Sequence, residues 1–277
     1  MNDAIRYIVS RLSDTYPEQE CRDMAWWIME ETTGMSRSQL LCGCKDTKII
    51  PNLEIILSRL RRKEPIQYVF GHTLWNGLDL QVNPATLIPR PETAEVVVYL
   101  LRSTQDRADM PLRVLDIGTG SGCIAIALKK ARPHWEVHGI DISGETLSVA
   151  KHNAERNRTE VQFGRKDILS DEIGDFDIIV SNPPYICEKE KADMEKNVLE
   201  YEPSIALFVP DEDPLRFYRA IAKYAAKALQ PNGALYFEIN PIYEKETREM
   251  LEGFGFKDIE TKEDSFGKKR MMRATKK

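Results

Sequence analysis

The sequence predicts an α/β protein in which a doubly wound, mostly parallel sheet follows a small all-α unit and a β-hairpin. Three observations lead to this prediction. Apolar residues recur at three- and four-residue steps near the N-terminus, Asn76-Gly77 separates two alternating segments, and strand-like and helix-like stretches alternate beyond Pro111. Such alternation is typical of parallel strands that are joined by helices.

The N-terminal stretch has the periodicity of helices. Ile5, Ile8 and Leu12 fall on one face of a first helix. Ser36 and Asn52 are residue types that cap helices, and they precede two further short helical stretches. We therefore expect a small helical bundle ahead of the sheet.

The middle of the chain changes texture. Asn76-Gly77 lies between two segments of alternating apolar and polar residues, which is the strongest short-range signal for a hairpin. Pro91 and Glu92 then begin a helix, because proline and negative charge are favoured in a first helical turn. The predicted domains are 1–70 (helical), 71–90 (hairpin linker) and 91–277 (sheet).

The last part of the chain alternates between two kinds of segment. Strands are expected over 113–118, 136–141, 161–163, 176–181, 234–239, 256–261 and 269–274. Helices are expected over 121–131, 144–156, 214–229 and 244–254. In a doubly wound sheet, ligands bind at the carboxyl ends of the strands, where the connections diverge.

Composition narrows the class of protein. With 277 residues and 42% hydrophobic residues, the chain can bury an ordinary core. A net charge of −5 argues against stable binding to nucleic acid through the overall field. No apolar run approaches the roughly 18 residues that span a bilayer, so we expect a cytoplasmic protein without membrane contact. Five cysteines without a C-x-x-C pattern favour reduced thiols, and the Cys42 and Cys44 pair lacks further ligands nearby, so no metal site is expected.

The segment Asp116-Ile-Gly-Thr-Gly-Ser-Gly122 closes the first strand and opens the next helix. Its glycines let a ligand approach the backbone closely. Asp141 ends the following strand, where a carboxylate can accept both hydroxyls of a ribose. Glycine turn and carboxylate together indicate a nucleoside ligand, with S-adenosylmethionine and NAD as the leading candidates.

Asp167 follows the third strand and has two interpretations. It can accept from an adenine amino group while the backbone N–H of Ile168 donates to a ring nitrogen. It can equally cap the segment that follows it. The residue pattern leaves both open.

The stretch Ser181-Asn-Pro-Pro-Tyr-Ile186 ends a buried strand on two prolines. Proline has no N–H, so this backbone offers carbonyl acceptors without competing donors. Together with the side-chain oxygen of Asn182, these acceptors can hold a planar NH2 group by both hydrogens while Tyr185 lies against its flat face. The alternative is an asparagine turn whose prolines merely stop the strand.

These motifs resemble those of a known family. "DIGTGSG", Asp141 and "SNPPYI" are similar to class I S-adenosylmethionine methyltransferases that modify planar amide or exocyclic nitrogens. "IPRPET" and "EYEPSIALF" resemble the protein-(glutamine-N5) methyltransferases that act on peptide chain release factors, the HemK or PrmC family. "ETTGMSRSQL" resembles the helical N-terminal domain of that family.

The resemblance implies a seven-stranded class I methyltransferase fold and S-adenosyl-L-methionine as cofactor. It implies methylation of the N5 atom of the glutamine in the Gly-Gly-Gln motif of class 1 release factors, with the helical domain gripping the body of the release factor. We expect the protein to be a monomer. A DNA or RNA amino-methyltransferase of the NPPY type is the alternative, and an NAD-dependent oxidoreductase or a non-catalytic scaffold is less favoured.

Site residues follow from the same resemblance. The matching cofactor-binding positions are Gly118, Thr119, Gly120, Ser121, Gly122, Asp141, Asp167, Ile168 and Asn182. The matching substrate-binding positions are Asn182, Pro183, Pro184, Tyr185, Arg90 and Glu92, of which Asn182, Pro183 and Tyr185 are implied to be catalytic. Arg90 and Glu92 belong to the IPRPET segment, where they either contact substrate or pair with each other. Glu202 and Pro203 match a family element for which the sequence suggests no role.

Overall fold

The computed structural model describes residues 3–43, 50–170 and 174–277. They divide into two compact units. One unit holds the described residues up to Gly71 together with Glu195–Tyr201, and the other holds His72–Met194 and Glu202–Lys277. The hairpin, expected as a linker, thus belongs to the second unit. Cys44, the second member of the cysteine pair, lies outside the described residues.

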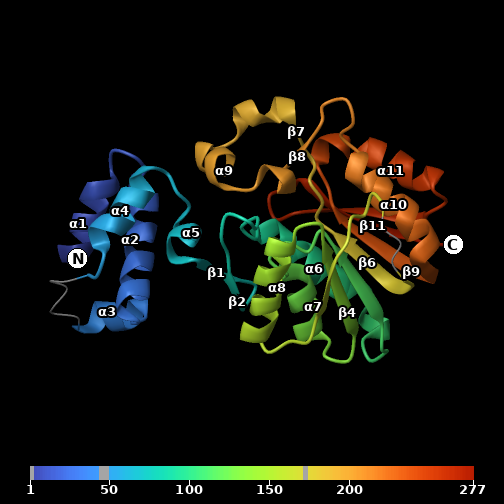
Figure 1. The fold of residues 1–277 in the computed structure, drawn as a ribbon, viewed down its shortest axis with the longest axis horizontal. Helices are drawn as coiled ribbons and strands as arrows, with labels where there is room; N and C mark the ends of the chain where they lie inside the picture. The colour runs from blue at the N-terminus through green and yellow to red at the C-terminus, as the bar shows by residue number, and fades with distance from the viewer. Residues whose placement is uncertain (1–2, 44–49, 171–173) are drawn as a thin grey trace. The chain divides into compact units, whose positions relative to one another are not determined.

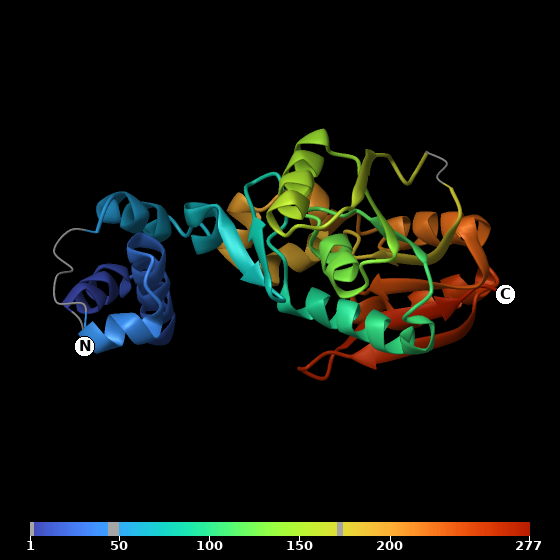
Figure 2. The same ribbon diagram turned by 90° about the horizontal axis from the view of Figure 1, so that it is seen from below.

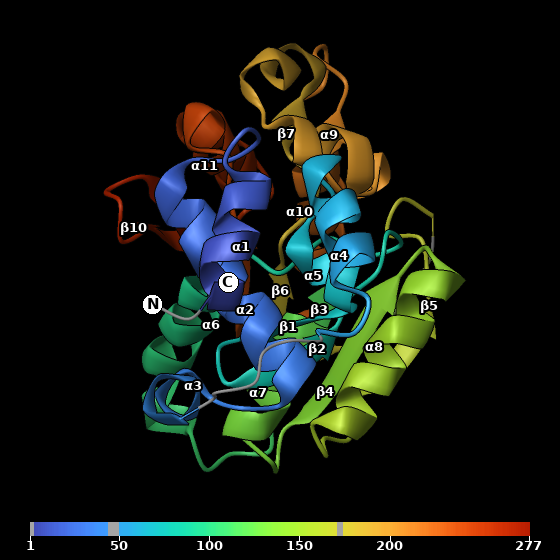
Figure 3. The ribbon, with the colours of Figure 1, turned by 90° about the vertical axis from the view of Figure 1, so that its left-hand side faces the viewer.

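The first unit is a helical bundle, as its periodicity predicts. Its helices are α1 (Asp3–Leu12), α2 (Glu18–Thr33), α3 (Arg37–Gly43), α4 (Leu53–Arg61), α5 (Ile66–Phe70) and α9 (Lys196–Tyr201). Ile5, Ile8 and Leu12 are buried where α1 packs on α2 and α4 (Figure 3). Asn52 occupies the N-cap position of α4, but its side chain makes no capping hydrogen bond, because its backbone is left-handed there. The Tyr201 hydroxyl of α9 donates to the carbonyl of Arg62.

The predicted hairpin is confirmed. Strands β1 (His72–Trp75) and β2 (Leu78–Gln81) pair antiparallel, and Asn76 and Gly77 both have positive φ, of 47° and 74°. This is the backbone that a two-residue turn of the right twist requires.

The second unit is built on one seven-stranded sheet, which confirms the predicted fold class. Its strands are β3 (Arg113–Ile117), β4 (Glu136–Asp141), β5 (Gln162–Arg165), β6 (Phe176–Ser181), β9 (Leu229–Glu238), β10 (Lys257–Glu263) and β11 (Lys269–Thr275). Their order is β10-β11-β9-β6-β3-β4-β5, and β11 runs antiparallel to both neighbours. The edge strand β5 packs beside α8 (Gly144–Arg156) (Figure 3).

Helices cover both faces of this sheet (Figures 1 and 2). α6 (Pro91–Ser103), α7 (Cys123–Ala131) and α8 lie on one face, and α10 (Arg216–Ala228) and α11 (Glu244–Gly253) lie on the other. Neighbouring residues of one strand divide between the two cores, since Val114 packs with α6 and α7 while Leu115 packs with α10. This alternation is what a strand buried on both faces produces.

Several short elements escaped prediction. They are the paired strands β7 (Ile186–Cys187) and β8 (Phe208–Val209), and the 3₁₀ turns Gln105–Arg107, Glu188–Asp193, Ser204–Ala206 and Pro241–Tyr243. Elements this short carry no readable period. Within the described part of the chain, none of the helices combines the length and the apolarity needed to cross a bilayer.

Candidate functional site

The predicted motifs lie together at the carboxyl ends of the parallel strands. β3 pairs in parallel with β4 on one side and β6 on the other, so their carboxyl ends lie next to one another. The glycine turn follows β3, Asp141 ends β4 and Asn182 follows β6. These strand ends line a cavity of about 350 Å³.

Most of the predicted site residues line this cavity. Those that do are Gly118, Thr119, Gly120, Ser121, Asp141, Asp167, Ile168, Asn182, Pro183, Pro184 and Arg90. Among the described residues, Gly122, Tyr185 and Glu92 do not belong to the lining. The structure therefore brings the cofactor-type and amide-type motifs together at one cavity and leaves these three residues outside its lining.

Asp141 is hydrogen-bonded to the turn beside it. Its Oδ2 accepts from the N–H of Gly120 at 3.1 Å, and its Oδ1 accepts from the N–H of Ser143 at 3.0 Å. Burial raises the pKa of this carboxyl, while these backbone donors work against the shift. Each carboxylate oxygen has two lone pairs, so Asp141 can hold the turn and still accept from a ligand hydroxyl.

Asp116 is hydrogen-bonded to the same glycine turn, a role that the sequence analysis did not predict. Its side chain is fully buried, and Oδ2 accepts from Thr119 Oγ1 at 2.6 Å and from the N–H of Ala125 at 3.3 Å. Within the described residues Oδ1 has no hydrogen-bond partner. Burial raises the pKa of Asp116 to about 7. An acidic residue inside an otherwise apolar strand was the available signal.

Gly122 serves packing rather than the cavity lining. Its φ is +83°, and a Cβ there would lie 3.0 Å from Ile126 Cδ1 and 3.2 Å from Ala150 Cβ. The missing side chain lets α7 start against α8.

Asp167 closes a turn after β5. Its Oδ1 accepts from the N–H of Leu169 at 2.9 Å, which closes a turn rather than capping a helix, since among the described residues no helix lies between β5 and β6. It also lines the cavity next to Ile168, whose side chain packs on the core beneath. Closing this turn and contact with a ligand are therefore compatible at this position.

The NPPY element divides between cavity and core. Asn182 and the two prolines line the cavity, and Asn182 Nδ2 donates to Thr93 Oγ1 at 3.1 Å. The Tyr185 hydroxyl instead donates to Glu238 Oε1 at 3.0 Å, and its ring packs with the core under α10. Tyr185, expected against the flat face of an amide, thus lies outside the described cavity lining, with its hydroxyl bound to a buried partner.

Arg90 pairs with a different carboxylate from the one considered in the sequence. Its Nη2 lies 2.6 Å from Glu202 Oε1, so the proposed mutual pair with Glu92 gives way to Arg90–Glu202. Glu202 Oε2 also accepts from the N–H of Ile88 at 3.1 Å. Glu202 thereby acquires a role, since it anchors the segment ahead of α6. Pro203 stands before the 3₁₀ turn at Ser204–Ala206.

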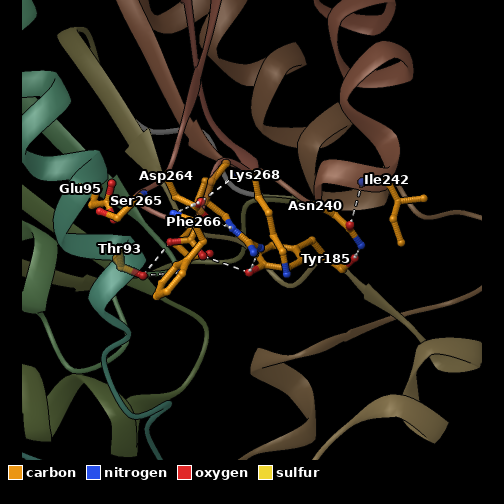
Figure 4. A network of polar contacts seen from close by, with 12 residues as sticks. Thr93, Glu95, Tyr185, Asn240, Ile242, Asp264, Ser265, Phe266 and Lys268 are labelled. Carbon is orange, nitrogen blue, oxygen red and sulfur yellow. Dashed lines mark hydrogen bonds and ion pairs between the residues drawn. The ribbon is translucent and has the colours of Figure 1, made fainter.

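A buried carboxylate, Glu238, lies behind Asn182 and was not singled out in the sequence. Its side chain accepts from Thr93 and Tyr185, and Figure 4 shows these two residues on opposite sides of the network. Glu238 is 2% exposed. As with Asp116, an acid within an apolar strand, "ALYFEI", was the signal that could have revealed it.

The sheet order, the glycine turn and the Asn-Pro-Pro element at one cavity define a class I methyltransferase. Residues 97–201 match the family described as "Methyltransferase small domain", and residues 3–71 match the "PrmC N-terminal domain". The crystal structure of a methyltransferase from Pyrococcus furiosus shares the fold, with a TM-score of 0.52 and 20% identity over 73% of this chain and 90% of that chain.

Full-length relatives narrow the class to a family. A release factor glutamine methyltransferase of Bacteroides thetaiotaomicron is 44% identical over 286 residues, covering 100% of both chains. A release factor glutamine methyltransferase of Flavobacterium psychrophilum is 43% identical, covering 96% of this chain and 95% of the relative. The chain belongs to the release factor glutamine methyltransferase family.

Proposed function

We propose that this protein transfers a methyl group from S-adenosyl-L-methionine to the side-chain nitrogen N5 of the glutamine in the Gly-Gly-Gln motif of class 1 peptide chain release factors. One observation carries the proposal: the glycine turn and the NPP element open into one cavity, in a chain that shares 44% identity over its full length with a release factor glutamine methyltransferase.

The cavity suits the nucleoside part of the cofactor. Asp141 has lone pairs for ribose hydroxyls, the turn at Gly118–Ser121 offers exposed backbone, and Ile168 provides apolar cover for an adenine ring next to Asp167. When bound, the cofactor supplies a methyl group that its sulfonium centre already activates. The enzyme mainly has to place a nucleophile in line with this group.

Asn182 and Pro183 hold the nucleophile. The nitrogen of a carboxamide is a weak nucleophile because its lone pair is delocalised into the carbonyl. Acceptors at Asn182 Oδ1 and the Pro183 carbonyl bind both N–H bonds, draw electron density toward nitrogen and orient it, and Pro184 keeps the backbone free of competing donors. The nitrogen becomes acidic on methylation, so its proton leaves to water without a strong base.

The remaining predicted residues act around this centre. Arg90 lines the cavity and can contact the substrate backbone, whereas Glu92 in the first turn of α6 and Tyr185 in the core act through their neighbours. The helical domain, proposed as 1–70, recognises the body of the release factor. We place the protein in the cytoplasm as a monomer that forms no stable complex with nucleic acid.

The test is methyl transfer to a purified release factor. After incubation with S-adenosyl-L-methionine, the peptide that contains the Gly-Gly-Gln motif should gain one methyl group on its glutamine, as measured by tandem mass spectrometry. A release factor with that glutamine replaced by alanine is the matched control. If the peptide stayed unmodified after long incubation while DNA or RNA in the same assay gained methyl groups, the proposal would be refuted.

A further inference from the structure

Asn182 is hydrogen-bonded to a chain of polar groups that begins at Thr93, a residue of the cavity lining, and Figure 4 shows this network between Thr93 and Tyr185. Thr93 Oγ1 donates to Glu238 Oε2 at 2.6 Å, and Asn182 Nδ2 donates to Thr93 Oγ1 at 3.1 Å. On the other side of Glu238, the Tyr185 hydroxyl donates to Oε1 at 3.0 Å, and Arg270 Nη1 lies 3.4 Å from the Tyr185 oxygen. Residues from α6, β9, β11 and the NPPY element thus share one chain of contacts.

The direction of every hydrogen bond in this chain follows from the protons available. A guanidinium has only donors, so the Tyr185 oxygen accepts from Arg270 and its single proton goes to Glu238. A threonine hydroxyl also has a single proton, and Thr93 gives it to Glu238. Thr93 Oγ1 can therefore only accept from Asn182. Both oxygens of Glu238 are acceptors, as in an ionised carboxylate.

This direction decides which end of the Asn182 carboxamide faces the cavity. Only its NH2 group can donate to Thr93, so Oδ1 is turned away from Thr93. Asn182 lines the cavity, and within the described residues its side-chain hydrogen bonding runs through Nδ2 alone. Oδ1 is therefore left to accept from a ligand.

We propose that Glu238 is a positioning residue that fixes the orientation of the Asn182 carboxamide through the hydroxyl of Thr93. The inference rests on the proposed function, because the oriented oxygen matters for holding the NH2 group of a substrate carboxamide. If Glu238 were neutral and able to donate, the Thr93 proton could turn to Asn182. The carboxamide would then rotate and present donors to a substrate that itself only donates.

The charge of Glu238 is set by groups from every element around it. Burial raises its pKa, and Thr93, Tyr185 and Arg270 work against this shift. The titratable or charged groups that face it are Tyr185 after β6, Arg270 on β11, Glu92 on α6, Cys123 on α7 and Tyr218 on α10. We therefore expect turnover to fall on acidification at a pH above the ordinary range for a glutamate.

We call the hydrogen-bonded chain from Glu238 through Thr93 to Asn182 the relay. Two substitutions break it with little change in side-chain volume. Glu238→Gln introduces a donor at the buried end, and Thr93→Val removes the hydroxyl. We expect kcat for release factor methylation to fall roughly 10- to 100-fold in both, as for a misplaced reacting group. The dissociation constant for S-adenosyl-L-methionine should stay close to that of the unaltered protein. Thr93→Ser restores the hydroxyl and should recover most of the turnover.

The control is Ser103→Ala, which removes a hydroxyl from the same helix. Ser103 bonds to the Tyr236 hydroxyl at 2.8 Å, away from the cavity lining. It should lose some stability, as Thr93→Val does, but keep the turnover of the unaltered protein. In Glu238→Gln the remaining turnover should no longer fall on acidification, because the group that titrates is gone. Wild-type kcat in Glu238→Gln and Thr93→Val at a temperature where both are folded would overturn the inference.

A readout without substrate separates this inference from the proposed function. The side-chain NH2 resonances of Asn182, identified by their loss in Asn182→Ala, should shift in Thr93→Val and in Glu238→Gln but not in Ser103→Ala. A protein that methylates no release factor yet shows these shifts would disprove the function and retain the relay. Unchanged Asn182 resonances in an active enzyme would disprove the relay alone.

Discussion

The guanidinium of Arg90 is bound by a carboxylate that lies 112 positions away in the chain, with Arg90 Nη2 at 2.6 Å from Glu202 Oε1. The two ends of this pair differ in exposure, since the Glu202 side chain is 1% exposed and the Arg90 side chain is 34% exposed. Glu202 also accepts from the N–H of Ile88. The segment that carries Arg90 into the cavity lining is thus anchored by a buried charge.

The asymmetry of this pair predicts an unequal response to substitution. Arg90→Ala leaves a buried carboxylate without its cation and should lower the free energy of unfolding by roughly 3 kcal/mol. The double variant Arg90→Ala/Glu202→Gln should be more stable than Arg90→Ala, because a neutral carboxamide needs no cation and can still accept from Ile88. Urea unfolding measures both. Equal stability of the two variants would show that the charge of Glu202 is not what the pair compensates.

Asn182→Ala should separate turnover from cofactor binding. The carboxamide is proposed to hold the substrate nitrogen, so kcat should fall roughly 100-fold, in the range seen when one polar group at a reacting centre is removed. Binding of S-adenosyl-L-methionine, measured by calorimetry, should weaken far less. An equal loss in both quantities would instead assign Asn182 chiefly to the cofactor.

Gly122→Ala should impair folding and cofactor binding together. The left-handed backbone and the crowding by Ile126 and Ala150 add to a cost of about 2–4 kcal/mol in the free energy of unfolding. The displaced turn should also weaken affinity for S-adenosyl-L-methionine. Gly253→Ala is the control, because a Cβ there meets nothing within 4 Å. A Gly122→Ala protein as stable as the control would contradict the packing role.

Local patterns in the sequence explain which parts of the fold could be predicted. The spacing of Ile5, Ile8 and Leu12 identified a helix, and the Asn76-Gly77 turn identified a hairpin, because both signals depend only on neighbours in the chain. The glycine turn, Asp141 and Asn182 could be placed at one edge because parallel strands end on the same side. That rule needs topology but no side-chain detail.

The side-chain contacts between residues far apart in the sequence could not be predicted. The sequence has 44 acidic residues that could pair with Arg90, and the sequence interpretation favoured Glu92 because it is near in the chain. The structure pairs Arg90 with Glu202. The relay from Glu238 to Asn182 joins residues from separate elements, so it has no pattern in the sequence. Two-residue strands such as Ile186–Cys187 are likewise formed by their surroundings rather than by a period of their own.

Asp116 predicts a stability that falls as pH rises, the reverse of a well-solvated or well-paired carboxylate. Burial raises its folded pKa from 3.8 to about 7. Between these values the folded state binds the proton and the unfolded state does not, so stability is fully present below the lower value and is lost as pH rises through the upper one. Asp116→Asn should therefore raise the unfolding midpoint at pH 8, an advantage that shrinks toward pH 5.

Asp264 is the control for this measurement, because its pKa is shifted in the opposite direction. Burial tends to raise its pKa, but the N–H groups of Lys268 and Phe266 and the Arg270 guanidinium outweigh it and lower the pKa. Its contribution is present above the ordinary pKa and is lost on acidification through the folded value. Asp264→Asn should thus destabilise at pH 8, where Asp116→Asn stabilises. Thermal unfolding across pH 4 to 8 compares them, and shifts of the same sign at pH 8 would show that the buried Asp116 carboxylate is compensated by a contact other than Thr119 and Ala125.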